Sequence, residues 1–517
     1  MDSTMRRVVV VGGSAAGWTA AARLARARPG TVAVTVLQTP RAAPDLMETG
    51  QVTAVPPEFQ PMVLDPLGVT EDHWTRACGA SFRTAVRYVN WRSDGAYGSG
   101  ARALADGTAD HFYRPYAAVP ECENGPLSHY WRYLRSGGRT LEPSDYACFH
   151  EPPLMDARKS PRWLDGRTAF PYGWHVDTGR FGAFLRDLAV RRLGVRVLHD
   201  SVRSVERDGN GMLTVLHTEK GRRIEGDFFV DCTGREGLLL SKVLGEPFVG
   251  AEGRLLCDGA ATVTVPHDDR ARGIEPFATA TAVPEGWSWK LPLPGLFGAG
   301  LLYSRARTGP YEAEGRLCAL YGLDPERAEV RHVRHRFGRS RRAWVKNCVA
   351  LGAAAGQVEP LAGDALTEVM EAVDLLIREF PSPDAPEAPA ARFNRAARER
   401  YERAADAVQL HYAAAGRTDA GFWRAQRALP PSAALARHLD AHRRGSAPGP
   451  GAEAHHALLS ALIAAAPDAD AAPGPGPAAL RAAEERLTRV KRRQNILLET
   501  LPTAHAYLER LHERAAA

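Results

Sequence analysis

The sequence has few cysteines, and they form no recognisable motif. Its 517 residues include 7 cysteines, which are widely scattered and contain no C-x-x-C pair. An odd number at such wide spacing suggests neither a disulfide framework nor a zinc site. We therefore expect no bound metal.

Long hydrophobic runs are also missing. No apolar stretch approaches the roughly 20 residues that a membrane-spanning helix needs. The first apolar strand begins within about ten residues of the start, which leaves no room for a signal peptide. We expect a cytoplasmic protein with no membrane partner.

Dense basic runs are absent as well, although the net charge is +6. The arginines are spread along the chain, and the richest stretch, residues 331–342, is typical of a solvated face or of a site for an anionic cofactor. Because no nucleic-acid-binding motif is present, we expect no nucleic-acid partner. The hydrophobic content of 44% is ordinary for a globular protein.

What the sequence does contain is a strand, a glycine turn and a helix start at residues 7–22, RVVVVGGSAAGWTAAA. The valine run predicts a strand buried on both faces. Gly12 permits a tight turn, and Gly17 lets the helix pack close to its strand. Small Ser14 and Ala15 let backbone N–H groups approach a pyrophosphate at the positive end of the helix dipole. This pattern predicts a dinucleotide-binding loop.

Two positions depart from the G-x-G-x-x-G fingerprint. The middle glycine is Ser14, and the acidic residue expected at the end of the second strand, VAVTVLQ, is Gln38. An amide still hydrogen-bonds a ribose hydroxyl, without charge assistance. A strand-to-helix turn without a ligand stays an open alternative. The cofactor-binding residues predicted from this stretch are Gly12, Gly13, Ser14, Ala15, Ala16, Gly17 and Gln38.

Further along the chain, strands and helices alternate before a helical end. The FYRPY cluster at residues 112–116 suits a flat aromatic substrate or an ordinary core corner. Residues 47–57 form a loop that either covers a cofactor or is a plain surface loop. Residues 446–453 and 464–478 are typical of flexible connections. The predicted fold class is α/β with a helical C-terminal region.

Short motifs in a fixed order resemble those of the flavin-dependent tryptophan halogenase family, from about residue 6 to residue 512. The motifs are GGSAAGW, YVNWR, SHYW, WHVD, DCTG, WSWKLP, ALGAAAGQVEPL, FNR and LHY. The resemblance implies a flavoprotein-monooxygenase-like fold. Residues 1–380 would form a Rossmann-like FAD-binding and β-rich box, discontinuous in space, and residues 381–517 a helical substrate-covering region.

The resemblance also implies a reaction. Reduced FAD from a separate flavin reductase reacts with O₂ to give a C4a-hydroperoxide, chloride attack gives hypochlorous acid, and this reaches a lysine beside the aromatic substrate. A glutamate then helps to remove the ring proton. Further cofactor contacts implied here are Val202, Asp231, Gly352, Pro360 and Leu361.

Three departures from the family pattern bear on that chemistry. The lysine position is Arg83, whose guanidinium stays protonated. The E-S-T-G segment is replaced by AGDA at residues 362–365, which removes the glutamate and places Asp364 where a halide would bind. Like charges about 4 Å apart repel by roughly 4 kcal/mol at an effective dielectric constant of 20. In FYRPY, the family's histidine and phenylalanine correspond to Arg114 and Tyr116.

These departures favour a monooxygenase that uses reduced FAD and O₂ to hydroxylate or otherwise oxidise an indole or a tryptophan-derived aromatic in secondary metabolism. Arg83 and Asp364 are its predicted catalytic residues, and Phe112, Arg114 and Tyr116 are predicted to bind substrate. Two alternatives stay open: a halogenase with relocated catalytic residues, and an inactive flavin-binding relative. The substrate is free, peptide-linked or carrier-linked, and no pattern in the sequence specifies the oligomeric state.

Overall fold

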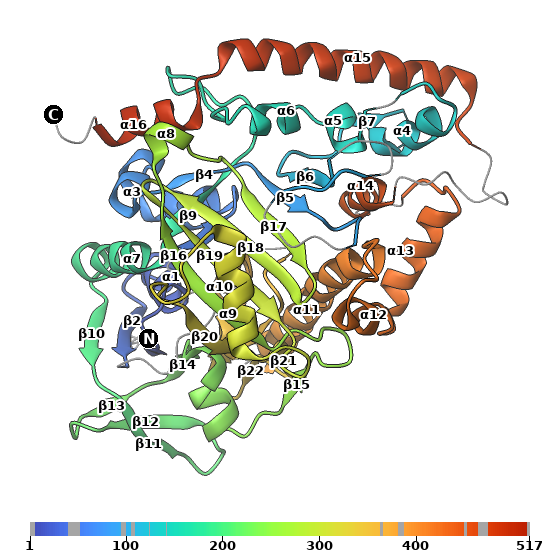
Figure 1. Cartoon of the computed structure of the whole chain (residues 1–517). Helices are drawn as coiled ribbons and strands as arrows, with labels where there is room; N and C mark the ends of the chain where they lie inside the picture. The colour runs from blue at the N-terminus through green and yellow to red at the C-terminus, as the bar shows by residue number, and fades with distance from the viewer. Residues whose placement is uncertain are drawn as a thin grey trace. The chain divides into compact units, whose positions relative to one another are not determined.

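The computed structural model describes residues 6–39, 52–94, 100–104, 109–123, 125–140, 142–361, 365–380, 387–448, 452–463 and 474–513 (Figure 1). The chain divides into two compact units. Unit 1 is Met1–Ala80, Val176–Glu252 and Val333–Ala405, and unit 2 is Ser81–His175, Gly253–His332 and Asp406–Ala517. The chain therefore alternates between the units, which do not coincide with residues 1–380 and 381–517.

Unit 1 contains a six-stranded sheet in the order β10-β2-β1-β14-β23-β22. The five strands from β10 to β23 are parallel, and β22 is antiparallel to β23. The valines of β1 are almost fully buried, as a strand covered on both faces requires. The strands are β1 (Arg6–Val11), β2 (Val32–Gln38), β10 (Arg196–His199), β14 (Phe228–Asp231), β22 (Trp344–Val345) and β23 (Cys348–Ala350).

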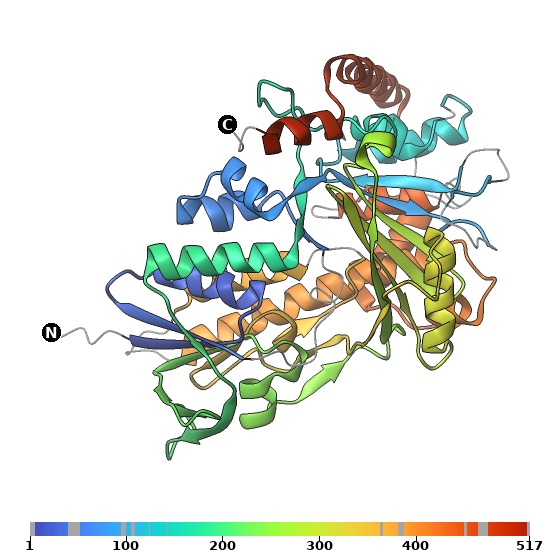
Figure 2. The same cartoon turned by 60° about the vertical axis from the view of Figure 1, so that its left-hand side comes forward.

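Helices pack against one another beside this sheet, as Figure 2 shows for α1 and α7. The α-helices of unit 1 are α1 (Ala15–Ala27), α3 (Glu71–Cys78), α7 (Thr178–Leu193) and α10 (Ala365–Arg378), and α11 (Glu387–Ala414) begins there. Its short helices are η1 (Gln60–Leu64), η2 (Asp65–Leu67), η3 (Gly234–Glu236), η4 (Leu238–Val243) and η5 (Gly352–Ala354). Its other strands are β3 (Val52–Val55), β11 (Val202–Arg207), β12 (Leu213–Thr218), β13 (Arg223–Glu225), β15 (Phe248–Gly250), β21 (Gly338–Ser340) and β24 (Gly356–Gln357).

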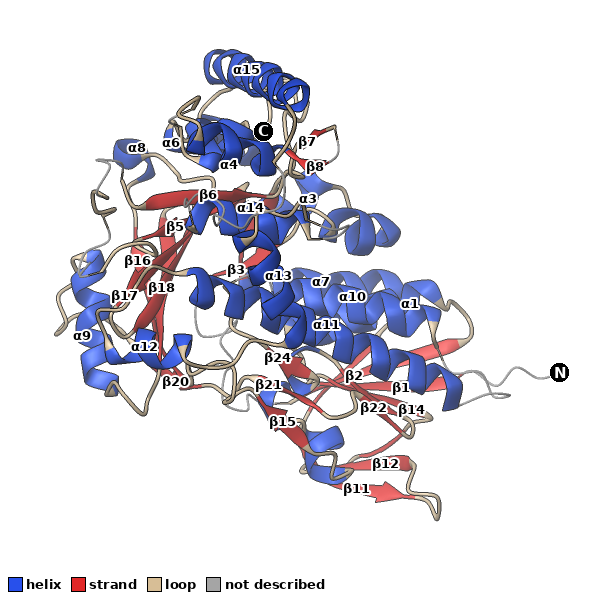
Figure 3. Cartoon of the chain, turned by 90° about the vertical axis from the view of Figure 1, so that its right-hand side faces the viewer, coloured by secondary structure: helices blue, strands red, loops and turns tan. Residues whose placement is uncertain are grey.

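Unit 2 contains a seven-stranded sheet in the order β20-β16-β19-β18-β17-β5-β6, whose strands are red in Figure 3. The pairing of β5 with β17 is parallel, and β5 is antiparallel to β6. The strands are β5 (Ala85–Val89), β6 (His111–Pro115), β16 (Gly259–Pro266), β17 (Ala278–Val283), β18 (Gly286–Leu293), β19 (Leu296–Tyr303) and β20 (Arg331–Arg334). The small strands are β4 (Ser81–Arg83), β9 (Gly173–Asp177), β7 (Glu121–Cys122) and β8 (Gly125–Pro126).

Helices of unit 2 bury apolar side chains against this sheet and against each other. Helix α9 contributes Ala313, Leu317 and Leu320 to a core shared with β16 and β19. Helix α15 packs on α4, α5 and α6. The helices are α4 (Leu127–Ser136), α5 (Ser144–Cys148), α6 (Glu151–Asp156), α8 (Asp269–Arg272), α9 (Pro310–Tyr321), α12 (Gly421–Arg427), α13 (Ala433–Arg443), α14 (Glu453–Leu462), α15 (Pro477–Thr500) and α16 (Ala504–Glu513).

Among the described residues, no helix is both long and apolar enough to cross a membrane. The same part of the chain contains no cluster of three or more histidine, cysteine, aspartate or glutamate side chains arranged to hold a metal ion.

Candidate active site

The parallel strands of unit 1 bring the predicted cofactor-binding residues to one edge of the sheet. Val11 is in register with Leu37 and with Asp231, and Asp231 is in register with Ala350. Because parallel strands end at the same edge, the segments after β1, β2, β14 and β23 lie together. This edge is where open α/β sheets bind their ligands.

The turn from β1 into α1 is shaped by two glycines. Gly12 has φ +118°, and a Cβ there would collide with the backbone carbonyl of Cys232. A Cβ on Gly17 would collide with the carbonyl oxygen of Gly12. Both positions therefore need glycine, as the sequence predicted for a tight turn followed by a closely packed helix.

The start of α1 fits an anionic group. Ser14 is the N-cap, but its side chain makes no capping hydrogen bond, and the first turn contains no acidic residue. The first N–H groups of a helix have no partner within the helix. They and the helix dipole therefore suit a pyrophosphate.

Gln38, at the end of β2, fits the ribose of a dinucleotide. A Cβ on Gly13 would lie 2.5 Å from the Cγ atom of Gln38, so the absence of a side chain on Gly13 leaves room for this amide. The Gln38 Oε1 atom is buried and accepts no hydrogen bond from any described residue. A buried acceptor without a donor is costly, and a ribose hydroxyl would satisfy it. These residues therefore fit an adenine dinucleotide such as FAD.

Asp231 has a structural task within unit 1. Its carboxylate accepts hydrogen bonds from the backbone N–H groups of Thr233, Leu239 and Leu240, at 2.8 to 3.1 Å, and from the Thr233 hydroxyl at 2.6 Å. Burial raises the pKa of this carboxyl, and these hydrogen bonds lower it. The side chain thus holds the turn after β14, and its predicted contact with the cofactor stays a prediction.

The other predicted cofactor contacts in unit 1 are Gly352, Val202, Pro360 and Leu361, which lie in the segments after β10 and β23. Gly352 has φ +61°, and its ideal Cβ would lie 3.4 Å from the Cβ of Ala16, so η5 runs beside α1. Val202 begins β11, shortly after β10, whose His199 is in register with Gln38. Leu361 is buried and Pro360 half-buried. Asp364, predicted to be catalytic, lies outside the described residues, as do residues 362 and 363.

Arg83 and Tyr116, predicted separately in the sequence, form a pair in unit 2. An Arg83 guanidinium N–H donates a hydrogen bond to the Tyr116 hydroxyl, and the guanidinium carbon lies 5.2 Å from the centre of the Tyr116 ring. The Tyr116 N–H donates to the carbonyl of Thr84 at 3.1 Å, which holds the end of β6 beside β4. Arg83 is only 6% exposed. It is therefore a buried, oriented cation rather than a surface arginine.

Phe112 and Arg114 lie on β6, near His411 of the LHY motif, a residue for which the sequence predicted no separate role. Phe112 stacks on Tyr88 with ring centres 4.9 Å apart, and Tyr88 lies 4.9 Å from the ring of His411. The Nδ1 atom of His411 lies 2.7 Å from the Ala407 carbonyl, which fixes the tautomer with hydrogen on Nδ1. Burial, assisted by the charge of Arg114, lowers the pKa of His411 to about 3. His411 is thus a neutral imidazole, and its Nε2 atom is a hydrogen-bond acceptor with no partner among the described residues.

Lys290 of the WSWKLP motif, the lysine that a halogenase with relocated catalytic residues could use, is held in an ion pair. Its ammonium nitrogen lies 2.8 Å from the Glu275 carboxylate and 4.8 Å from the centre of the Phe297 ring. Glu359 of the ALGAAAGQVEPL motif, a carboxylate close in sequence to the position of the family's glutamate, is buried in unit 1. The ion pair gives Lys290 its own place in unit 2.

The fold and this edge define an α/β protein with a Rossmann-like dinucleotide-binding unit. The family model for tryptophan halogenases matches residues 7–464, and the chain belongs to that family. Tryptophan 7-halogenase RebH of Lentzea aerocolonigenes is 39% identical, over 99% of this chain and 100% of the relative. Tryptophan 6-halogenase ThaL of Streptomyces albogriseolus is 40% identical, over 86% of this chain and 83% of the relative.

Solved structures agree with this assignment. Tar14, a tryptophan C-6 flavin-dependent halogenase from taromycin biosynthesis, superposes with a TM-score of 0.86 at 30% identity, covering 98% of this chain and 99% of that one. The tryptophan 6-halogenase SttH of Streptomyces toxytricini superposes with a TM-score of 0.85 at 29% identity, covering 98% and 99%.

The expectation of a hydroxylating monooxygenase is therefore wrong. It rested on substitutions at a few positions, whereas relatives that match this chain over its full length are halogenases. Arg83, Arg114 and Tyr116 change individual donors in unit 2 without altering the fold that these enzymes share. The absence of a catalytic lysine and glutamate stays a prediction, as do the roles assigned to single residues.

Proposed function

We propose that this protein is a flavin-dependent halogenase that acts on tryptophan or a related indole in secondary metabolism. It would use FAD, reduced by a separate flavin reductase, together with O₂ and a halide. The observation that carries the proposal is the match to tryptophan 7-halogenase RebH along the whole of both chains. Tar14, which belongs to taromycin biosynthesis, supports a place in secondary metabolism.

In this proposal the carboxyl edge of the unit 1 sheet holds FAD. The N–H groups at the start of α1 bind the pyrophosphate, and Gln38 accepts a hydrogen bond from the ribose. Bound FAD supplies the activation of O₂ that halide oxidation needs. Gly352, Pro360 and Leu361 approach the ring system of the cofactor from the segment after β23.

The aromatic groups of unit 2 bind the indole. Phe112 offers an apolar ring next to Tyr88, and Arg114 offers a cation that holds a carboxylate or stacks on the ring. Arg83 takes the position of the family's lysine. Because a guanidinium carries several N–H donors in a fixed plane, Arg83 can bond Tyr116 and still hold the oxidised halogen species by hydrogen bonding. It keeps its charge throughout turnover, so it orients that species rather than exchanging a proton with it.

Omission assays test this proposal. The full-length protein is incubated with FAD, a flavin reductase with NADH, air, L-tryptophan and bromide, and conversion is followed by liquid chromatography. We expect conversion only when reductase, FAD, O₂ and bromide are all present. Conversion of tryptophan that continues at the same rate without any halide would refute a halogenase. Absence of conversion of tryptophan and of a panel of indoles, in a preparation that binds FAD, would also refute it.

A further inference from the structure

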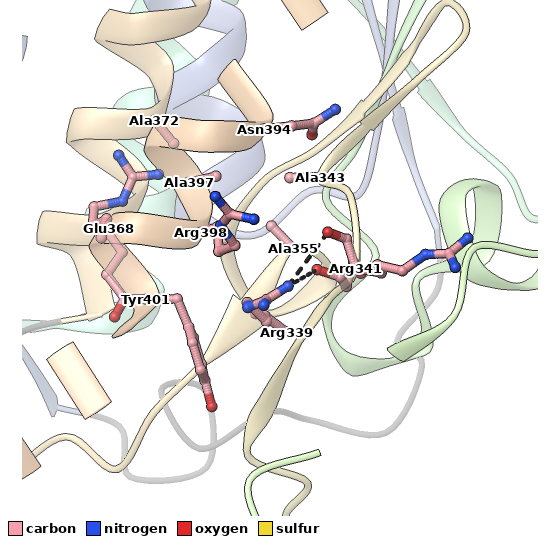
Figure 4. Close-up of a pocket in the computed structure, with 14 residues that line it drawn as sticks. Arg339, Arg341, Ala343, Ala355, Glu368, Ala372, Asn394, Ala397, Arg398 and Tyr401 are labelled. Carbon is pink, nitrogen blue, oxygen red and sulfur yellow. Dashed lines mark hydrogen bonds between the residues drawn. The ribbon is translucent and has the colours of Figure 1, made fainter. Parts of the chain in front are cut away.

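A pocket in unit 1 lies between α10, α11 and the chain that follows β21, and Figure 4 shows its lining. Its empty volume is about 500 Å³, counting the part open to solvent. Its charged lining residues are Arg339, Arg341, Glu368, Arg398 and Arg400, and we call it the arginine pocket. Of the predicted FAD contacts it includes only Gly352, from the segment after β23, and its charged lining comes from β21 with the residue after it, α10 and α11.

The arginine pocket is strongly cationic. Four guanidinium groups and one carboxylate line it, which is a formal charge of +3. Burial raises the pKa of the Glu368 carboxyl to about 7, against the opposing effect of nearby Arg400. The one acidic group is therefore partly neutral near pH 7. A concave cationic surface concentrates anions from solution.

Carboxylates outside the lining offset part of this charge, through long ion pairs with Arg339, Arg341 and Arg400. The Arg339 Nε atom lies 3.5 Å from Glu402, whose side chain is 46% exposed. The Arg341 Nε atom lies 3.5 Å from Glu246, and the Arg341 side chain is 61% exposed. Each pair is long and has one exposed partner, since the Arg339 side chain is 16% and the Glu246 side chain 2% exposed, and water weakens the attraction at the exposed side. An incoming anion can therefore compete for these guanidinium groups.

Two further arginines come from α11. The Arg400 Nη1 atom lies 3.8 Å from Glu371, and burial lowers the pKa of Arg400 against the opposing effect of Glu371 and Glu368. Arg398 is exposed, and it makes neither a hydrogen bond nor an ion pair with any other described residue. Figure 4 shows Arg398 of α11 and Arg339 of β21 on the lining of the arginine pocket. Arg398 is thus the cation most available to a ligand.

The walls are held in place and leave space between them. Asn394 of α11 accepts a hydrogen bond from the Trp344 N–H and donates one to the Trp344 carbonyl, both at 2.8 Å, which fixes α11 to the chain after β21. A Cβ on Gly356 would lie 2.8 Å from the Cβ of Arg339, so the strand pair needs glycine there. The remaining lining includes the small side chains Ala343, Ala355, Ala372 and Ala397. Small residues around arginines leave room for a compact ligand.

We propose that the arginine pocket is a second ligand site, which binds a compact phosphate-bearing anion separately from the flavin site. A planar guanidinium group can donate two parallel hydrogen bonds to two oxygens of one phosphate. A pocket lined by carboxylates or apolar side chains offers no such donors. Arg398 and Arg339 would contact the phosphate, and Arg400 adds positive charge to the same lining. Free polyphosphate and a nucleotide diphosphate share this chemistry.

Titration calorimetry of the full-length protein tests the proposal, with pyrophosphate and ADP as separate probes, each with and without saturating FAD. We expect one pyrophosphate site that survives FAD saturation. Arg398→Gln should weaken it by about tenfold or more. Arg395→Gln, which removes another exposed arginine of α11 that does not line the pocket, is the matched control and should leave binding unchanged. Tighter binding of ADP than of pyrophosphate identifies a nucleotide as the ligand, and equal binding identifies the phosphate group alone.

Three results would overturn the proposal. Absence of pyrophosphate binding at moderate salt removes the site. Loss of pyrophosphate binding on FAD saturation makes the pocket part of the flavin site. Equal weakening by Arg398→Gln and Arg395→Gln shows general attraction to a basic surface. Because none of these measurements depends on turnover, they separate this site from the proposed halogenase activity.

Discussion

At the scale of single residues, the main chemical question is how buried Arg83 acts at the position where the family has a lysine. Its hydrogen bond to Tyr116 joins two positions that are 33 residues apart in the sequence. The same pairing shows why sequence reasoning identified both residues without foreseeing their contact: it depends on the hairpin of β5 and β6, which brings Tyr116 next to Thr84.

Substitution of Arg83 should remove turnover while leaving the flavin site intact. We expect Arg83→Gln to lower kcat by about 100-fold or more, because it removes the oriented cation that we propose holds the oxidised halogen species. Tyr116→Phe, which only removes the hydrogen-bond partner of Arg83, should cost about tenfold. The checks are kcat and KM for the indole, with the Kd for FAD measured on the same preparations. Wild-type kcat in Arg83→Gln would show that Arg83 takes no part in the reaction.

Gln38 is the residue whose unsatisfied acceptor indicates the cofactor. Gln38→Ala should weaken FAD binding by about tenfold, because the ribose loses its hydrogen-bond partner. Gln38→Glu should tighten it, because the acceptor becomes charged. Flavin fluorescence quenching measures both affinities. An unchanged Kd in Gln38→Ala, with an unchanged melting temperature, would place the ribose elsewhere.

At the scale of elements, three helices of unit 2 bury a cluster of histidines. His129 of α4, His442 of α13 and His456 of α14 are each less than 10% exposed. The ring centre of His456 lies 5.0 Å from that of His442 and 5.8 Å from that of His129. Burial lowers their pKa values to about 4 for His129, about 3 for His442 and about 2 for His456. These helices therefore pack around neutral imidazoles.

This cluster should make the protein sensitive to acid. Below the usual histidine pKa of about 6.5, the unfolded chain binds protons that the folded cluster excludes. The contribution of the cluster to the free energy of unfolding should therefore be at its maximum above pH 6.5, and it should decrease as the pH drops toward 4. His442→Gln should reduce this dependence by roughly 1 kcal/mol per pH unit, whereas His199→Gln, at an exposed position, should not. Chemical denaturation between pH 5 and pH 7 measures the slopes, and equal slopes in His442→Gln and wild type would contradict the account.

Local elements were predictable where neighbouring residues determine them. The buried strand β1, the glycine turn and the start of α1 follow from a valine run and small residues within one short stretch. The turn held by Asp231 was not predictable as such, because its donors lie between Thr233 and Leu240 and become visible only in the folded backbone. The LHY motif includes His411, but the contact of this histidine with Tyr88 was not predictable, because the two residues are far apart in the sequence.

At the scale of the whole molecule, the order of motifs predicted the family and fold class correctly, and the reaction class wrongly. Side-chain changes at positions such as 83 and 114 were weighed more heavily than the framework around them. The relatives that match this chain over most of its length are tryptophan halogenases.

The most direct test of the central claim identifies the atom added to the product. The enzyme is supplied with reduced FAD, ¹⁸O₂, excess bromide and L-tryptophan, and the product is examined by mass spectrometry. The account predicts the paired isotope pattern of one bromine and no ¹⁸O in the product. A product that carries ¹⁸O and no bromine would contradict it.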